Sequence, residues 1–127
     1  MPGRGDPLIQ TVAAAPAVTR LAGRIEEGVL GTSTGVVSLT GAPPGLFPYL
    51  LEAVGGPLGL KWAVVFAHEK DAAAFARDAA SVLGAPRVAL FPAPALSPYQ
   101  GIAPSLKVRR DEFGALQRLA SGEVTVL

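Results

Sequence analysis

Residues 36–54 read VVSLTGAPPGLFPYLLEAV, and this stretch decides which fold the sequence predicts. Its first part, Val36–Thr40, is short and rich in β-branched residues, which is typical of a buried strand. Two prolines follow at positions 43 and 44, and proline presets the backbone angle φ for the first turn of a helix. The apolar segment Leu46–Val54 then predicts that helix, and the sequence Gly-Gly-Pro at 55–57 is expected to end it. The stretch therefore predicts a strand, a tight loop and a helix in succession.

The same alternation continues along the rest of the chain. Trp62–Ala67 is a nearly continuous apolar run, which is typical of a strand covered on both faces and therefore of a parallel sheet. Arg87–Phe91 and Val124–Leu127 predict two further strands. The predicted fold class is α/β, a doubly wound, mostly parallel sheet with right-handed crossovers and helices on both faces. Because the chain stops on an apolar strand, we expect the domain to be truncated there and that strand to be an unprotected edge.

Three more helices are predicted, one before the first strand and two between later strands. The first lies between Pro16, which suits a helix start, and Gly28, which suits an end. The second follows Trp62–Ala67 and closes at Gly84. The third has Ser105 as its N-cap and ends at Gly122. Their inward faces are predicted from helical spacing to be Val18, Leu21, Ala22 and Ile25 in the first, Ala72, Phe75, Ala76, Ala79, Val82 and Leu83 in the second, and Phe113, Leu116 and Ala120 in the third.

The composition limits the size and the chemistry of the protein. Its 127 residues suit one domain, which we expect to span 16–127 behind a poorly ordered leader, 1–15. A net charge of +1 gives no field that would favour autonomous DNA binding. There is no cysteine and one histidine, so thiolate chemistry is excluded, a histidine-based zinc site is improbable, and the reducing cytoplasm is the expected location. Glycines and prolines interrupt the uncharged run Val29–Leu51, so we expect no membrane span and no membrane partner.

The loop that follows the first predicted strand occupies the place of a phosphate-binding loop. Such loops have the form G-x-x-x-x-G-K-[ST], in which backbone amides face the phosphates, the lysine reaches them and the hydroxyl binds magnesium. With Gly41 as the middle glycine and Ala42 after it, Ser38 replaces the first glycine and Pro43 the second. In the two key positions that remain, the lysine is replaced by Pro44 and the hydroxyl residue by Gly45. This degenerate nucleotide loop is not expected to hold ATP, although an ordinary strand-to-helix turn explains the same spacing.

Four segments together resemble the amino-terminal region of the bacterial transcription-repair coupling factor (Mfd) family. They cover most of the chain from Pro16 to Leu127 and read PAVTRLAGRIEEG, VVSLTGAPPGLFPYLLEAV, WAVVFAHEKDAAAFARDAASVLG and VALFPAPALSPYQGIAPSLKVRRDEFGALQRLASGEVTVL. In that family this region is similar to the first domain of the repair protein UvrB, with its helicase motif I decayed. The short loop from Pro92 to Pro104 fits Mfd better than UvrB, which inserts a long β-hairpin near this point. The pair Pro43-Pro44 departs even from the usual decayed loop.

The resemblance implies a function for a longer protein. In the Mfd family the full-length protein is an ATP-driven DNA translocase that displaces stalled RNA polymerase and recruits UvrA for nucleotide-excision repair. ATP and magnesium are implied only for that full-length form, and this chain is expected to carry no cofactor and no catalytic residue. Its direct partner would be the remainder of its own full-length protein, while UvrA, RNA polymerase and DNA would be partners of the whole.

A few other residues have two interpretations. His68 with Glu69 follows a predicted strand end, where catalytic residues of open sheets gather, but the acidic residues there equally favour a helix start. Lys107, Arg109 and Arg110 form a basic cluster, predicted to lie opposite Phe113 and Leu116, which is either a solvated helix face or a contact with a phosphate or a partner. Ser97 has no histidine near it in sequence that would activate it, and Tyr99 is expected to pack the proline-rich loop or to contact a partner.

Three hypotheses of function therefore remain open at the level of sequence. The first is a non-catalytic, UvrB-like scaffold piece of a repair-coupling translocase. The second is a small doubly wound enzyme domain that binds a nucleotide or another cofactor at the ends of its strands. The third is a free-standing interaction domain without a ligand. The sequence downstream of Leu127 would distinguish them best, because the first hypothesis requires a second UvrB-like module there, followed by a polymerase-contacting domain and intact helicase motifs.

Overall fold

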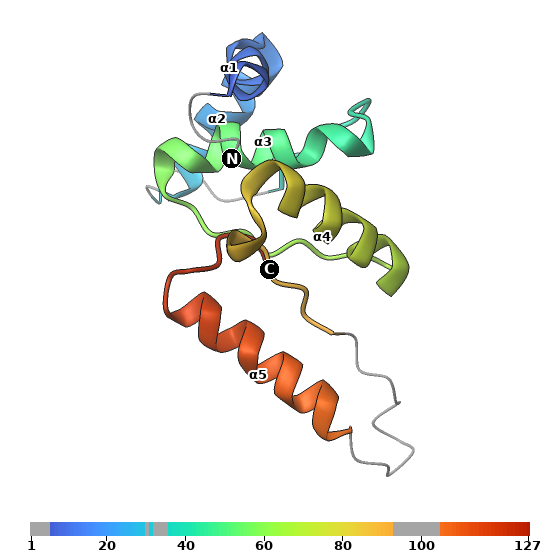
Figure 1. Cartoon of the computed structure of the whole chain (residues 1–127). Helices are drawn as coiled ribbons and strands as arrows, with labels where there is room; N and C mark the ends of the chain where they lie inside the picture. Colours follow the sequence, from blue (N-terminus) through green and yellow to red (C-terminus); the bar gives the residue numbers. More distant parts are fainter. Residues whose placement is uncertain (1–5, 30, 32–35, 93–104) are drawn as a thin grey trace. The chain divides into compact units, whose positions relative to one another are not determined.

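The computed structural model describes residues 6–29, 31, 36–92 and 105–127, and these residues form two compact units (Figure 1). The first unit runs from Met1 to Lys61 and the second from Trp62 to Leu127. Each unit is described by itself below. The division falls just before the apolar run that begins at Trp62, and it does not coincide with the boundary expected at residue 16.

The first helix of unit 1 lies inside the segment that we expected to be a poorly ordered leader. Helix α1 spans Pro7–Ala14, and the carboxylate of Asp6 caps it by accepting a hydrogen bond from the Leu8 amide at 2.8 Å. Pro7 suits the first helical position because the amide that it lacks would have no partner inside the helix. The side chain of Ile9 is buried in the unit. A cap, a proline at the start and one buried apolar residue therefore suffice to fix this segment as a helix.

Two further helices complete unit 1. Helix α2, Pro16–Val29, confirms the helix predicted between Pro16 and Gly28. Helix α3, Phe47–Leu58, contacts both α1 and α2, and the unit buries Val18, Leu50 and Val54. Helix α3 continues through Gly55-Gly56-Pro57, where we expected it to end, and it stops at Gly59, whose φ of 63° is left-handed. Pro57 stands inside the helix and lacks the amide that would bond to the carbonyl oxygen of Ala53, so α3 continues through it with one internal hydrogen bond fewer.

The strand predicted at Val36–Thr40 is wrong. These residues have no regular secondary structure, and their side chains are exposed, Val36 at 93% of its surface. A β-branched run becomes a strand only when a neighbouring segment accepts its backbone hydrogen bonds. No described segment of unit 1 pairs with Val36–Thr40, so the strand propensity of these residues does not produce a strand.

Unit 2 is built on two long helices. Helix α4 spans Glu69–Leu83, begins after His68 with Glu69 and Asp71 in its first turn, and is closed by Gly84. A short 3₁₀ turn, η2, follows at Ala85–Arg87. Helix α5 spans Leu106–Ala120, and the hydroxyl of Ser105 accepts a hydrogen bond from the Val108 amide at 3.3 Å. The predicted N-cap at Ser105 and the predicted end at Gly84 are both confirmed.

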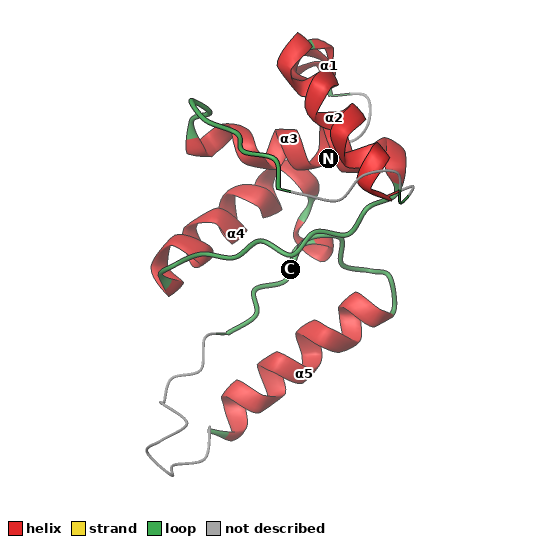
Figure 2. Cartoon of the chain, turned by 180° about the vertical axis from the view of Figure 1, so that it is seen from behind, coloured by secondary structure: helices red, strands yellow, loops and turns green. Residues whose placement is uncertain are grey.

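The three apolar runs of unit 2 meet, but they do not form a sheet. Val126 makes one parallel bridge to Trp62 and another to Val88, and both bridges are isolated. Among the described residues no strand is formed, and Figure 2 accordingly shows helices joined by loops. The predicted doubly wound α/β sheet is therefore wrong, and the described chain is mainly helical. Pairing that extends over one or two residues gives too few consecutive backbone hydrogen bonds to make a strand.

The prediction that Trp62–Ala67 is covered on both faces is also wrong. Along this run the half-buried residues alternate with exposed ones, and Val65 exposes 91% of its surface. The run is therefore extended but buried on one side only. Its apolar composition did not reveal this, because a continuous apolar run looks the same whether one face or both are covered.

Two residues of the terminal segment are among the best buried of unit 2. Val124 and Val126 are 0% and 2% exposed, and Val124 packs with Ala89 and Ala115. Leu119 and Leu127 cover this small core. The last segment is thus central to the unit and is not the unprotected edge that we expected.

Helix α5 turns a different face inward from the one predicted. Ala115 is buried, whereas Phe113, Leu116 and Ala120, which we expected to point inward, are exposed. The reason is steric: the small side chain of Ala115 lets the helix approach the backbone around Ala89 and Val124, which a phenylalanine at the contact would prevent. Within the described residues no helix combines the length and the hydropathy that crossing a membrane requires.

Candidate functional site

The degenerate nucleotide loop lies on the surface of unit 1. Ser38, Gly41, Pro43, Pro44 and Gly45 are exposed, and Ala42 is half-buried. Gly41 has a φ of 78°, a left-handed angle that glycine adopts without strain. After the extended Pro43, the 3₁₀ turn η1 at Pro44–Leu46 leads directly into α3. The loop therefore has the position of a phosphate-binding loop, in front of a helix start.

The backbone amides of this loop are not arranged as a phosphate cradle. Pro43, Pro44 and Pro48 have no amide hydrogen to donate. The amide of Leu46 donates to the carbonyl oxygen of Pro43 at 3.0 Å, and the amide of Phe47 donates to the carbonyl oxygen of Pro44. In the stretch 43–48 only Gly45 has an amide hydrogen that is not already donated within the turn. One amide without a lysine does not replace the several donors of a phosphate-binding loop.

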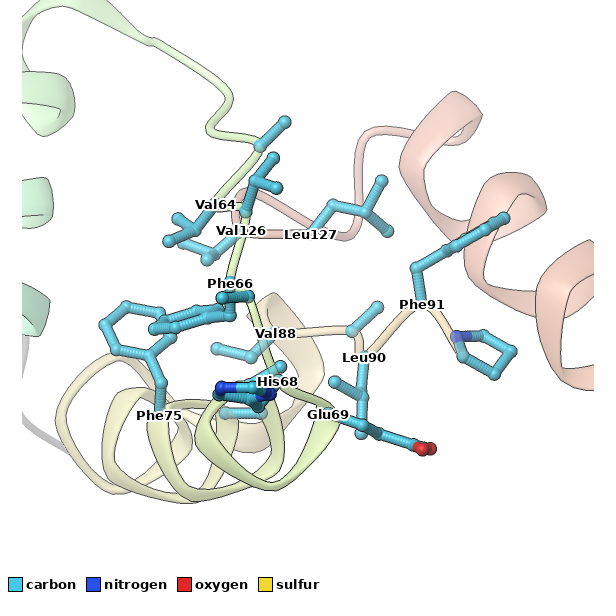
Figure 3. Close-up of a pocket in the computed structure, with 17 residues that line it drawn as sticks. Val64, Phe66, His68, Glu69, Phe75, Val88, Leu90, Phe91, Val126 and Leu127 are labelled. Atoms are coloured by element: carbon cyan, nitrogen blue, oxygen red, sulfur yellow. The ribbon is translucent and has the colours of Figure 1, made fainter. Parts of the chain in front are cut away.

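Unit 2 contains an apolar hollow of about 370 Å³. It lies between α4, the extended run 63–69, the run 88–92 and the last two residues of the chain (Figure 3). Phe66 and Phe75 meet on its wall, with ring centroids 5.2 Å apart and ring planes inclined by 44°. Val88, Leu90, Phe91, Val126 and Leu127 supply much of the remaining surface. A hollow of this volume and composition is typical of a site that receives apolar groups.

Two polar residues are among those that line this apolar hollow. They are His68, the N-cap of helix α4, and Glu69, its first residue, and both are exposed. In Figure 3 the carboxylate of Glu69 is turned away from Phe75. His68 makes no side-chain capping bond to the helix. The predicted helix start is confirmed, and the other residues that line the hollow are apolar.

The charge of the apolar hollow decides what it can hold. Neither lysine nor arginine lines it, and its one charged residue is Glu69. A nucleotide would bring phosphates next to a carboxylate with no cation to offset them, which is electrostatically unfavourable. An apolar side chain or a short apolar segment would meet aromatic and aliphatic surface instead. The hollow therefore suits apolar groups better than the phosphates of a nucleotide.

The basic cluster predicted on the third helix is found on the outside of α5. Lys107, Arg109 and Arg110 are exposed. They do not lie opposite Phe113, as we predicted, because residues three and four positions apart on a helix share one face, and Arg109 and Arg110 stand at those spacings. Tyr99, the fourth candidate partner contact, and Ser97 lie outside the described residues.

The apolar hollow is the feature that the sequence analysis missed. At the end of Trp62–Ala67 the sequence suggested only the polar pair His68 and Glu69 as a candidate site, and the aromatic residues that line the hollow were not predicted to form one. The usable signal was the cluster of Phe66, Phe75 and Phe91 near these ends, since phenylalanine is prominent in apolar sites.

Among the described residues no group of three or more histidine, aspartate or glutamate side chains is placed to hold a metal ion. Comparisons of the chain with family models, with curated proteins and with solved structures give no significant match.

Proposed function

We propose that this chain is a non-catalytic docking and scaffolding piece of a larger assembly. The observation that carries the proposal is the apolar hollow of unit 2, which exposes aromatic and aliphatic surface and has no cation for a nucleotide. The degenerate nucleotide loop supports it, because Pro43 and Pro44 have no amide hydrogen to donate and the loop contains no lysine. In this proposal an apolar element of the remainder of the full-length protein occupies the hollow.

The assembly that we propose is a cytoplasmic transcription-repair coupling factor, on the strength of the sequence resemblance to the Mfd family. ATP hydrolysis, DNA translocation, displacement of RNA polymerase and recruitment of UvrA would then be activities of the whole protein. This chain would contribute structure to it. Nucleotide binding in this hollow, which the alternative from sequence would require at the ends of the predicted strands, is disfavoured by Glu69 in the lining and by the absence of lysine and arginine from it.

The first experiment measures nucleotide binding by the whole chain. A fluorescent ATP analogue with magnesium is titrated against the protein, and we expect no saturable binding below millimolar nucleotide. An intact ATP-binding protein in the same assay serves as the positive control. Micromolar saturable binding would sink the proposal, because a scaffold with this loop has no means to hold the phosphates.

The second experiment tests the apolar hollow directly. A neutral solvatochromic dye such as Nile red is expected to bind the chain, and Leu90→Gln, which places an amide in the lining, is expected to weaken its binding several-fold. Leu39→Gln is the matched control, since Leu39 and Leu90 are 40% and 44% exposed and Leu39 lies in unit 1. Equal losses in both variants would show that the dye reports general surface hydrophobicity, and the docking role would lose its support.

A further inference from the structure

The outer face of helix α5 carries large apolar side chains that no other described residue of unit 2 covers. Leu106, Phe113 and Leu116 are 86%, 73% and 48% exposed. Their spacings of seven and three residues place them in one row along the helix. The orientation of the helix is fixed by its other side, where Ala115 is buried against Ala89 and Val124. The apolar row therefore faces outward because of how α5 packs.

Cations accompany this row. Arg109 and Arg110 stand three or four positions from Leu106 and from Phe113, and Lys107 stands three positions before Arg110. Within the part of the chain that the structure describes, none of the three forms an ion pair. By the same spacing, Asp111, which is exposed, shares a face with Lys107, and Glu112, which is half-buried, shares one with Arg109. Arg109 and Arg110 are the charges that flank the apolar row directly.

Arg118 shows what an arginine of the same helix does when it serves the fold. Its guanidinium donates to the carbonyl oxygen of Pro86 at 2.7 Å and lies 3.6 Å from the carboxylate of Glu123. It thereby holds the carboxyl end of α5 to unit 2. Arg109 and Arg110 have no comparable structural role among the described residues, which leaves their charges available to a partner.

We propose that this face, Leu106, Lys107, Arg109, Arg110, Phe113 and Leu116, docks an acidic amphipathic helix of a partner protein. The row from Leu106 to Leu116 is about 15 Å long at a rise of about 1.5 Å per residue, so it matches about three turns of a partner helix. Apolar residues of the partner cover the row, and its flanking carboxylates meet the three cations. The inference names a partner class for the scaffold and so rests on the proposed function, but it uses a surface separate from the apolar hollow.

The binding experiment uses the full chain and a designed helical peptide of three to four turns, with leucines along one face and glutamates on both sides of it. We expect micromolar binding that weakens as salt is raised, because exposed charges are screened. Arg109→Glu with Arg110→Glu is expected to weaken binding at least tenfold, and Phe113→Ala about tenfold. Arg20→Glu with Arg24→Glu, the same change of charge on exposed residues of α2, should leave binding unchanged.

Several outcomes would overturn the inference. One is equal binding of a peptide in which lysines replace the glutamates, and another is equal loss in both charge-reversal pairs. Binding to anionic phospholipid vesicles or to duplex DNA, with none to the acidic peptide, would assign the face to a membrane or to nucleic acid. Micromolar ATP binding in the separate nucleotide titration would contradict the proposed function without touching this result, so the two failures are distinguishable.

A labelling experiment tests whether the face is free in the whole chain. The sequence has no cysteine, so Gln117→Cys introduces a single thiol on an exposed position next to Leu116. We expect rapid reaction with a maleimide, slowed at least tenfold by the acidic peptide. Slow reaction without the peptide, at every protein concentration, would mean that the chain itself covers the face. Slow reaction only at high concentration would mean that a second copy does, and either result overturns the inference.

Discussion

The amide of Leu127 donates to the carbonyl oxygen of Trp62 at 2.9 Å, so the last residue of the chain is held to the first residue of unit 2. A second hydrogen bond joins the same two segments, because the Val64 amide donates to the carbonyl oxygen of Leu127 at 3.0 Å. On the other side, the Ala89 amide donates to the carbonyl oxygen of Val126 at 2.9 Å. The terminal segment thus joins two runs that are far from it in sequence, and the stability of unit 2 depends on it.

Val124→Ala should therefore destabilise unit 2 by about 2 kcal/mol, the range for removing buried methyl groups and leaving a cavity. Val124 is fully buried, whereas Val65 is 91% exposed, so Val65→Ala is the matched control and should change the unfolding free energy by less than about 0.5 kcal/mol. The measurement is urea denaturation followed by the fluorescence of Trp62, the one tryptophan of the chain. Equal midpoints for the two variants would contradict the central position of the terminal segment.

Two glycines of unit 1 should respond to alanine in opposite directions. Gly59 ends α3 at a φ of 63°, so Gly59→Ala should cost about 1 kcal/mol of unfolding free energy although nothing lies within 4 Å of the added carbon. Gly23 lies inside α2, where the added carbon also meets nothing, and Gly23→Ala should stabilise by about 0.5–1 kcal/mol. Thermal melts followed by far-ultraviolet circular dichroism would show the two shifts, and shifts of the same sign would refute the left-handed end of α3.

Helix ends could be predicted from the sequence because they depend on single residues. Ser105, Gly84 and Pro16 each act through local chemistry, namely a side-chain acceptor, a backbone without a side chain and a fixed φ. The end of α3 was missed because two glycines and a proline disfavour a helix without forbidding its last turn. Structural features that depend on one residue and its sequence neighbours could thus largely be predicted from the sequence.

Strands and inward faces depend on distant neighbours, and here the predictions failed. Val36–Thr40 and Trp62–Ala67 have the composition of strands, but the first has no described neighbour to pair with and the second is bridged only near its start. On α5, apolar residues occupy two faces. The folded unit buries the small Ala115 and leaves Phe113 exposed. The apolar hollow could not be foreseen in full, because its walls come from four separate segments.

The start of α1 gives a direct test of the segment that was expected to be poorly ordered. Asp6→Ala removes the acceptor of the Leu8 amide and should cost about 1 kcal/mol of helix stability. Asp6→Asn keeps a side-chain oxygen at the same place and should cost much less. Hydrogen exchange of the amides at 10–14 would report the difference, and rapid exchange in the unaltered chain would show that α1 is not stably formed.

The last prediction is that rebuilding the degenerate nucleotide loop will not produce an ATPase. The quadruple variant changes Ser38 and Pro43 to glycine, Pro44 to lysine and Gly45 to threonine, which restores the residue types of a phosphate-binding loop in front of α3. Binding of ATP is expected to improve, because the helix start already favours an anion and the substitutions return two amides. The fluorescent nucleotide titration would measure this gain.

Hydrolysis should nevertheless stay at the background level of the unaltered chain. It requires a carboxylate that helps to hold magnesium, a group that orients the attacking water, and commonly an arginine that is worth about 10³–10⁵ in rate. Glu52, the carboxylate in the middle of α3, is buried, with its side chain packed close to Gly56. Phosphate release by the variant would be measured with and without DNA. Turnover clearly above the background would reveal a catalytic set on this chain and would refute the scaffold proposal.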